Sequence, residues 1–130
     1  MAQQSIRLLP TKMAIVRYRP TEPFSVPAGP EFFSLIRTEK ELSIVMEASL
    51  VPKVAPIKST GWRLFEVAGP FELNAVGVLA SITAPLADAG VSIFALATYD
   101  TDYFLISARQ LKRAIKALRA AGHTVIDDCA

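Results

Sequence analysis

An internal repeat constrains the fold of this chain more than any other feature of its sequence. Residues 33–46 align with residues 94–107 at an offset of 61, and in both segments two apolar runs flank a short acidic stretch. The alignment pairs Phe33 with Phe94, Leu35 with Leu96, Glu39 with Asp100, Glu41 with Asp102 and, beyond the block, Leu50 with Leu111. Apolar runs on either side of a polar turn are typical of β-hairpins, so we expect one hairpin in each half.

The first copy of the repeat is shorter than the second. Residues 13–20 align with residues 63–70 at an offset of 50, which leaves the first copy 11 residues short, or about three helical turns. The segment that remains, residues 21–31, contains Pro23, Pro27 and Pro30. Three prolines in so short a stretch exclude a regular helix. We therefore expect an N-terminal unit that lacks a regular first helix.

The second half carries signals for every element of a βαββαβ unit. We expect a strand over residues 62–67, a helix with Asn74 as N-cap and Gly90 at its end, and a hairpin over residues 91–106. The inward face of that helix is expected to carry Val76, Leu79, Ile82, Thr83 and Leu86. A capping box from Ser107 to Gln110 predicts a second helix that ends at Gly122, followed by a strand over residues 123–126.

These elements predict an α+β fold of two ferredoxin-like (βαββαβ) units, each with an antiparallel sheet covered by helices on one face. We expect a degenerate unit over residues 1–55, a linker over residues 56–61 and a complete unit over residues 62–130. Residues 91–97 and 103–106 are apolar on both sides of their strands. A sheet covered on one face alternates more cleanly, so we expect a further cover from the first half, from a second chain in a homodimer, or from both.

Composition excludes several classes of protein. A net charge of +2 is too small to indicate nucleic-acid or membrane binding, and the single cysteine, Cys129, allows no intramolecular disulfide. No signal peptide or apolar span is evident, so we expect a cytoplasmic protein. Four cations at helical spacing, Lys112, Arg113, Lys116 and Arg119, are expected to form a solvated helix face, and the only histidine, His123, to be exposed.

Two stretches of the second half resemble the ACT domain, the ligand-binding module of amino-acid metabolism. They are Gly69-Pro-Phe-Glu-Leu-Asn-Ala-Val-Gly-Val-Leu-Ala-Ser-Ile82 and Leu86-Ala-Asp-Ala-Gly-Val-Ser-Ile-Phe94. More narrowly, Thr98-Tyr-Asp-Thr-Asp-Tyr103 and Arg37-Thr-Glu-Lys-Glu-Leu-Ser-Ile-Val45 resemble a stand-alone tandem-ACT family. That family is akin to the aspartate kinase regulatory region and to the cytosolic arginine sensor of animals.

The resemblance implies two ACT units packed side by side, with a ligand at their interface. By position it points to the start of the first helix, the strand that follows it and the hairpin turn: Gly77, Val78, Leu79, Ile93, Phe94, Ala95, Tyr99 and Asp100. One position departs from the pattern. Phe94 stands where aspartate-kinase ACT domains carry an aspartate that holds the ligand's amino group, and Phe33 aligns with it in the first half. This departure weakens any transfer of lysine or threonine specificity.

The residues also suggest how an amino acid could be held. Free backbone N–H groups at the start of a helix over Asn74 to Leu79 suit a carboxylate, and Gly77 allows close approach. The ammonium needs acceptors, which Glu72, Asp100 and Asp102 could supply together with the hydroxyl groups of Thr98 and Thr101. The alternative is purely structural: Asp and Thr favour turns, Asn74 only caps, and Gly77 only allows close packing.

The pattern therefore predicts a non-catalytic regulatory sensor for a small amino-acid-like ligand. The six glycines are too far apart for a phosphate-binding loop, and neither a metal-ligand cluster nor a nucleophile elbow is present, so we expect no enzyme, cofactor or metal. The strand over residues 103–109 lacks the aromatic and basic pattern of RNA-recognition motifs. The alternative is a protein-interaction module with a vestigial pocket, and a sensor also requires a regulated protein that the sequence does not identify.

Overall fold

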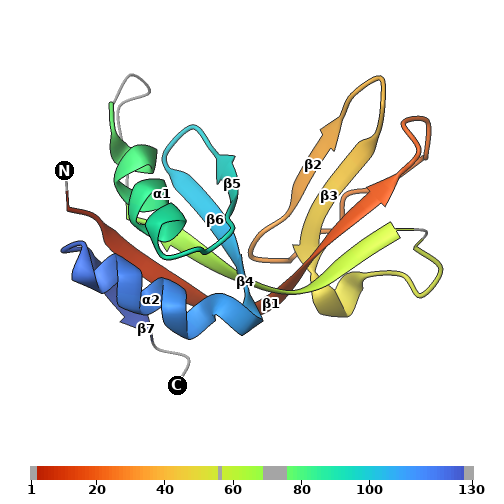
Figure 1. The fold of residues 1–130 in the computed structure, drawn as a ribbon. Helices are drawn as coiled ribbons and strands as arrows, with labels where there is room; N and C mark the ends of the chain where they lie inside the picture. The colour runs from red at the N-terminus through yellow and green to blue at the C-terminus, as the bar shows by residue number, and fades with distance from the viewer. Residues whose placement is uncertain (1–2, 56, 69–75, 128–130) are drawn as a thin grey trace. The chain divides into compact units, whose positions relative to one another are not determined.

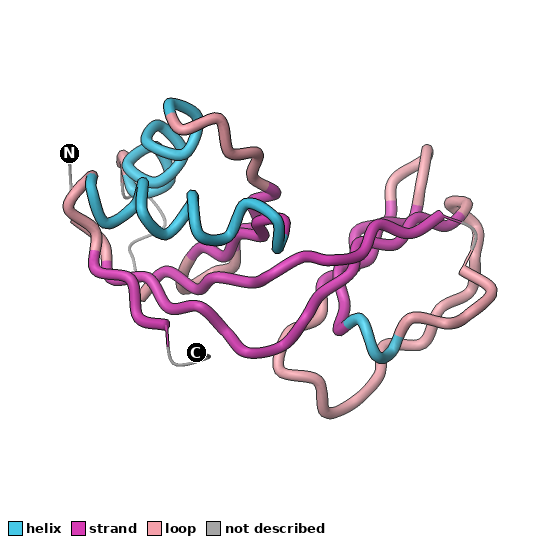
Figure 2. Tube along the Cα trace, turned by 60° about the horizontal axis from the view of Figure 1, so that its bottom comes forward, coloured by secondary structure: helices cyan, strands magenta, loops and turns pink. Residues whose placement is uncertain are grey.

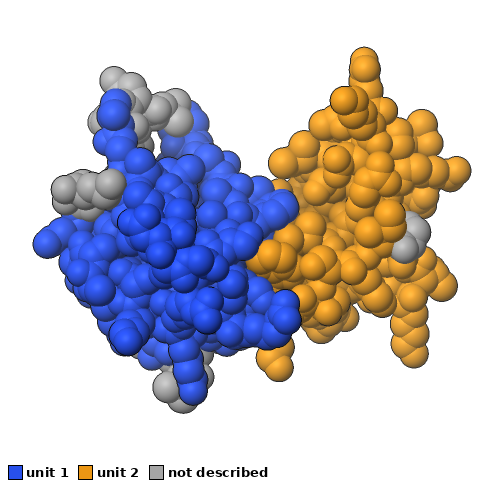
Figure 3. Space-filling model, in the orientation of Figure 1, with its two compact units in different colours: residues 1–10, 63–130 blue, residues 11–62 orange. Residues whose placement is uncertain are grey.

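The computed structural model describes residues 3–55, 57–68 and 76–127, and the chain divides into two compact units. Unit 1 comprises Met1–Pro10 with Arg63–Ala130, and unit 2 comprises Thr11–Trp62 (Figure 3). Strands β1 (Ser5–Tyr18) and β4 (Ile57–Val67) contribute residues to both units. Residues 1–10 thus belong to the unit of residues 63–130, whereas the sequence grouped them with residues 11–55. Residues 57–61, expected in a linker, are the first part of β4.

Unit 1 has the element order that the sequence predicts for its second half. β4 is followed by α1 (Val78–Asp88), β5 (Phe94–Ala97), β6 (Asp102–Ser107), α2 (Leu111–Ala120) and β7 (Thr124–Asp127). Both helices cover the same face of the sheet and pack against each other (Figures 1 and 2). The fold is α+β with the ferredoxin-like sequence of elements, as predicted.

The N-terminal strand adds to this unit a pairing that the sequence did not predict. β1 pairs in parallel with β7, from Ser5 opposite Thr124 to Leu8 opposite Asp127, and it also neighbours β4 and, farther along the strand, β3. The sheet is antiparallel, as predicted, in the β1–β3, β2–β3 and β5–β6 pairs, and the parallel β1–β7 pair departs from the prediction. Burial explains the insertion, because Ile6 and Leu8 alternate into the core and need a sheet position that no local pattern of residues 1–10 specifies.

The core of unit 1 lies between the sheet and the two helices. Phe65 of β4 and Phe104 of β6 are fully buried and stack with ring centroids 4.9 Å apart and an interplanar angle of 4°. Ile82 and Leu86 reach this core from α1, and the other fully buried helix residues in it are Ala114 and Leu118 of α2. Leu105 is also fully buried, so β6 is buried on both faces.

Helix α1 begins later than the sequence predicts. Its first residue is Val78, and Gly77 precedes it with a φ of 87°. Val76 is 94 % exposed and Leu79 37 % exposed, so the expected inward face is correct for Ile82 and Leu86 but wrong for these two residues. Asn74, the expected N-cap, lies outside the described residues.

Both helices of unit 1 end at the predicted glycines. Gly90 and Gly122 adopt φ values of 74° and 96°, which residues other than glycine rarely adopt. After α1, the N–H groups of Gly90 and Val91 donate to the carbonyls of Ala87 and Leu86, the pattern of a Schellman motif. The N–H groups of Gly122 and His123 repeat it after α2.

The predicted capping box before α2 is not formed. Residues Ala108–Gln110 make a short 3₁₀ turn (η2), and the Ser107 side chain makes no capping hydrogen bond. The Gln110 side chain instead accepts a hydrogen bond from the Ser92 N–H and donates one to the Gly90 carbonyl, each at 3.3 Å. Gln110 thus fastens the end of α1 and the segment before β5 to the start of α2.

His123 is buried, so the expectation of an exposed residue was wrong. Its side chain lies between three segments of unit 1. Nδ1 accepts a hydrogen bond from the Gln4 N–H at 2.9 Å, and Nε2 lies 2.7 Å from the Ser81 carbonyl oxygen. This arrangement fits a neutral imidazole that donates through Nε2. Because both ring nitrogens have a backbone partner, burial of this histidine leaves no polar group unpaired. The position of His123 after a helix-ending glycine did not indicate these partners.

Unit 2 consists of a hairpin on β1 and a long loop. The hairpin strands are β2 (Ser34–Arg37) and β3 (Leu42–Glu47), followed by the 3₁₀ turn η1 (Ala48–Leu50), and β3 pairs antiparallel with β1. Residues 19–33, all of them described, contain no helix, as the three prolines predicted. The rings of Phe24 and Phe33 cover the sheet instead. The ring centroid of Phe24 lies 5.9 Å from that of Tyr18 and 5.9 Å from that of Phe33.

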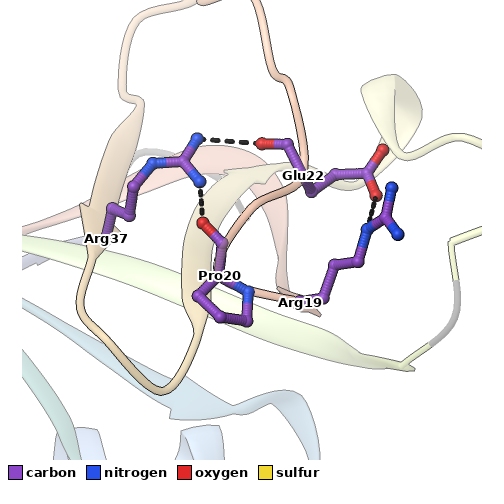
Figure 4. A network of polar contacts seen from close by, with 4 residues as sticks. All are labelled: Arg19, Pro20, Glu22 and Arg37. Atoms are coloured by element: carbon purple, nitrogen blue, oxygen red, sulfur yellow. Dashed lines mark hydrogen bonds and ion pairs between the residues drawn. The ribbon is translucent and has the colours of Figure 1, made fainter.

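The loop of unit 2 is fastened by Arg37 at the end of β2. Its guanidinium donates to the carbonyl oxygens of Pro20 and Glu22, the latter at 2.9 Å (Figure 4). Arg19 adds an ion pair to Glu22 at 3.2 Å. These contacts hold the first turn of the loop against the hairpin.

The two hairpins are equivalent at an offset of 60, not 61. Each has a first strand of four residues, a four-residue turn and a second strand of six, and Ser34 occupies the place of Phe94. The sequence alignment is therefore one residue out of register, and Phe33 corresponds to Ile93 instead of Phe94. A shift of one residue moves every strand side chain to the other face, so the residue pairs deduced from the alignment are wrong.

Candidate functional site

The acidic pocket is a cavity of about 510 Å³ in unit 1, lined by Glu66, Val67, Ala68, Thr98, Asp100, Thr101 and Tyr103. β4 supplies Glu66 and Val67 at its end, the β5–β6 turn supplies Thr98, Asp100 and Thr101, and β6 supplies Tyr103 near its start. Its volume is within the range of small-molecule sites.

The β5–β6 turn is fixed by its two threonines. The Thr98 N–H donates to the Thr101 carbonyl at 2.8 Å, and the Thr98 hydroxyl also bonds the Thr101 backbone. The Thr101 hydroxyl donates to the carbonyl of Val67 and so ties the turn to the end of β4. Because both ends of the turn are held, Asp100 is displayed from a defined backbone.

Tyr103 and Glu66 are linked across neighbouring strands. The Tyr103 hydroxyl donates to Glu66 Oε2 at 2.8 Å. Burial, this hydrogen bond and the negative charges of Glu66 and Asp100 raise the pKa of Tyr103 to about 12, because each disfavours a phenolate. Tyr103 therefore stays a donor, and the carboxylates of Glu66 and Asp100 make the pocket electronegative.

Among the described residues that line it, the pocket has two carboxylates and no basic side chain. Carboxylates form their strongest hydrogen bonds with ammonium and guanidinium groups, and Asp100 lies on an exposed turn where it can receive a ligand. The pocket is therefore suited to the cationic group of a small molecule. In the part of the chain that the structure describes, no group of three His, Cys, Asp or Glu side chains could hold a metal ion, and no helix is long and apolar enough to cross a membrane.

The structure brings only some of the predicted site residues together. Thr98, Asp100 and Thr101 line the acidic pocket, whereas Asp102 is half-buried opposite Ala97 and Tyr99 is 77 % exposed at the turn. Ile93 and Val78 pack against the core, and Phe94 is half-buried at the start of β5. Gly77 and Leu79 lie at the exposed start of α1, while Glu72 and Asn74 lie outside the described residues. Their roles in binding stay predictions.

Sequence reasoning missed Glu66 and the role of Tyr103. The sequence analysis named neither residue as part of the site. One signal was available in the sequence: Glu66 is a lone acid among the apolar residues Leu64, Phe65 and Val67. All three of these neighbours are buried in the structure. A charged residue within so apolar a strand needs a partner or a function.

Residues 58–120 match the family model described as an ACT domain. The structure is also similar to the crystal structure of protein Atu0741 from Agobacterium tumefaciens, with a TM-score of 0.89, 30 % identity and coverage of 98 % of this chain and 96 % of that one. The regulatory subunit of aspartate kinase from Thermus thermophilus shares the fold, with a TM-score of 0.64 and 13 % identity over 93 % of this chain and 99 % of that one.

Among curated proteins, the chain resembles the cytosolic arginine sensor for mTORC1 subunit 1 of Homo sapiens, with 29 % identity over 100 residues. The alignment covers 72 % of this chain but only 30 % of the sensor, so the chain spans about a third of the length of the curated relatives it matches. The same protein of Rattus norvegicus is 30 % identical over 103 residues. The match to the ACT-domain model places residues 58–120 of the chain in that family, and the chain as a whole is similar to protein Atu0741.

Proposed function

We propose that this protein is a non-catalytic regulatory sensor that binds an amino-acid-like ligand through the acidic pocket. One observation carries the proposal: the described residues that line a cavity of about 510 Å³ in an ACT unit include two carboxylates and no basic side chain. Two neighbouring carboxylates repel each other in the unliganded pocket, and a cationic ligand would offset this repulsion. Regulatory relatives support the same class of function.

The ligand's cationic group is assigned to Asp100 and the free oxygen of Glu66. Its carboxylate is assigned to the start of α1, where the N–H groups of the first turn have no partner within the helix. Arginine is the first candidate, because a guanidinium carries five N–H donors for these acceptors and the curated relatives are named as arginine sensors. A position at the interface of two ACT units and a cytoplasmic location remain parts of this proposal.

A thermal-shift screen of the full chain against the twenty amino acids tests the proposal. A ligand present at 100 times its dissociation constant stabilises the fold by about 2.7 kcal/mol, which shifts the melting temperature by several degrees. We expect arginine or another cationic amino acid to produce this shift. Asp100→Asn and Glu66→Gln, which preserve shape and remove charge, should abolish it, and Glu39→Gln on the exposed unit 2 turn should not.

The outcome distinguishes the sensor from the alternative. If no amino acid shifts the melt, the pocket is vestigial and the chain acts as a protein-interaction module. If a ligand binds equally well to the wild type and to both pocket variants, the ligand site lies elsewhere. Analytical ultracentrifugation with and without the ligand would then test the proposed homodimer, which should change in stability if the ligand binds where two ACT units meet.

A further inference from the structure

Helix α2 and the turn before it carry a cationic stripe, defined by Arg109, Lys112, Arg113, Lys116 and Arg119. All five side chains are exposed. At about 100° per residue they fall within roughly 120° of the helix circumference, on the side away from buried Ala114 and Leu118. No acidic residue occurs between Asp102 and Asp127.

The stripe borders a groove that runs between α2 and β7. The groove has a volume of about 430 Å³ and is lined by Lys112, Ile115, Lys116, Arg119 and Asp127. Arg119 donates to the carbonyl of Val125 at 2.8 Å, so its guanidinium is held over the strand that α2 packs against (Figure 1). Half-buried Ile115 is the apolar side chain among these lining residues, and we refer to it as the apolar floor of the groove.

The positive charge of this face is not neutralised within the described chain. Lys112, Arg113 and Lys116 make no ion pair with any described residue, and Lys112 and Lys116 stand four positions apart on the helix. Like charges at this spacing destabilise a helix. An anionic partner would remove that cost and gain charge-assisted hydrogen bonds.

We propose that the cationic stripe and its groove dock an extended acidic segment of a partner protein. The stripe from Arg109 to Arg119 is about 15 Å long, which matches four to five residues of extended chain. A segment with carboxylates over Lys112 and Lys116 and an apolar side chain over Ile115 complements the groove.

Other anionic partners fit this surface less well. Single-stranded nucleic acids need aromatic side chains for base stacking, and the groove has none among its lining residues. A membrane-bound helix inserts its apolar face, but the apolar face of α2 is buried in the core of unit 1. A second copy of this chain would need an exposed acidic strip to bind here. An assay of self-association would detect such binding.

The experiment measures fluorescence anisotropy of a labelled ten-residue peptide that alternates Glu and Leu, titrated with the full chain at low and moderate salt. We expect binding that weakens with salt and falls about tenfold or more in the Lys112→Glu/Lys116→Glu variant. The matched control Lys40→Glu/Lys53→Glu reverses two exposed cations of unit 2 and should retain the affinity. Unchanged melting temperatures confirm that both variants fold.

Three results would overturn the proposal: no binding of the acidic peptide at low salt, equal loss of affinity in both variants, or tighter binding of a single-stranded oligonucleotide of the same charge. Replacement of Glu by Gln in the peptide should abolish binding. Ile115→Ser should weaken the Glu–Leu peptide more than a peptide in which Ser replaces Leu, because only the former uses the apolar floor.

Discussion

Unit 1 and unit 2 contain the same hairpin but build different surfaces around it. In both, a threonine at the first turn position bonds the backbone of the fourth: the Thr98 N–H donates to Thr101, and the Thr38 N–H donates to Glu41. At the offset of 60, however, Asp100 in unit 1 corresponds to Lys40 in unit 2. The comparison teaches that a shared hairpin fixes the backbone of the turn but not the charge it presents.

The charged groups around the two turns differ. The unit 1 turn is tied to β4 beside Glu66, and the unit 2 turn receives a hydrogen bond from Arg17 to the Lys40 carbonyl at 3.2 Å. Unit 1 thus has the carboxylates of Asp100 and Glu66 at its turn, whereas the unit 2 turn carries Lys40 between Glu39 and Glu41. The cover of the two sheets differs as well, because two helices pack on unit 1 and the loop with Phe24 and Phe33 packs on unit 2.

The helix-covered core should contribute more stability than the loop-covered one. Phe104→Ala removes a fully buried ring stacked on Phe65, so we expect a loss of about 3–5 kcal/mol in the free energy of unfolding. Phe24→Ala removes a half-buried ring and should cost about 1 kcal/mol. Guanidinium denaturation measures both. Equal losses would show that the loop stabilises unit 2 as strongly as helices stabilise unit 1.

Both helices of unit 1 end in Schellman motifs. Gly90→Ala forces a side chain into the left-handed region and should cost roughly 1–2 kcal/mol. Gly90→Asn, which tolerates that conformation better, should cost less and serves as the matched control. Gly122→Ala should cost at least as much, because its Cβ would lie 3.1 Å from Gln3 Nε2. Thermal unfolding would detect these differences, and equal tolerance of Ala and Asn at residue 90 would contradict the strain argument.

The negative charge of the unit 1 turn should be visible in the titration of Tyr103. The pKa of Tyr103 is raised to about 12 from the ordinary 10.0, so its contribution to stability is complete below pH 10 and is lost as the pH rises through about 12. Glu66→Gln should lower this pKa, because it removes the nearest charge and keeps the shape. Ultraviolet absorbance of the phenolate measures it, with Tyr103→Phe to identify the transition. A bound cationic ligand should also lower the pKa, and an unchanged value would argue against a ligand in this pocket.

The smallest effect is expected at the loop of unit 2. Arg37→Gln removes the exposed hydrogen bonds to Pro20 and Glu22 and should cost about 0.5–1 kcal/mol (Figure 4). We expect faster amide exchange in residues 19–33 and unchanged exchange in unit 1. Arg17→Gln, which lacks these two contacts, is the control. Faster exchange across both units would show that the loop is coupled to the whole fold.

Local pattern was sufficient for much of this structure. Apolar runs on either side of a polar turn predicted both hairpins, the three prolines excluded a helix from residues 21–31, and Gly90 and Gly122 marked the helix ends. These features depend on backbone conformations that a few neighbouring residues determine by themselves. Thr98, Asp100 and Thr101 of the acidic pocket were found for the same reason, since they form one turn.

Long-range contacts decided the rest. The hairpin register corrected the alignment by one residue and exchanged Glu39 for Lys40 as the counterpart of Asp100, because cross-strand pairing sets which residue occupies each position. Glu66 lies on β4, far in sequence from the β5–β6 turn that it meets in the pocket. The backbone partners of buried His123, Ser81 and Gln4, are 42 and 119 residues away in sequence. Sequence determined the elements and the turn, and tertiary packing determined which charges meet, since charge pairing depends on distances that no local pattern encodes.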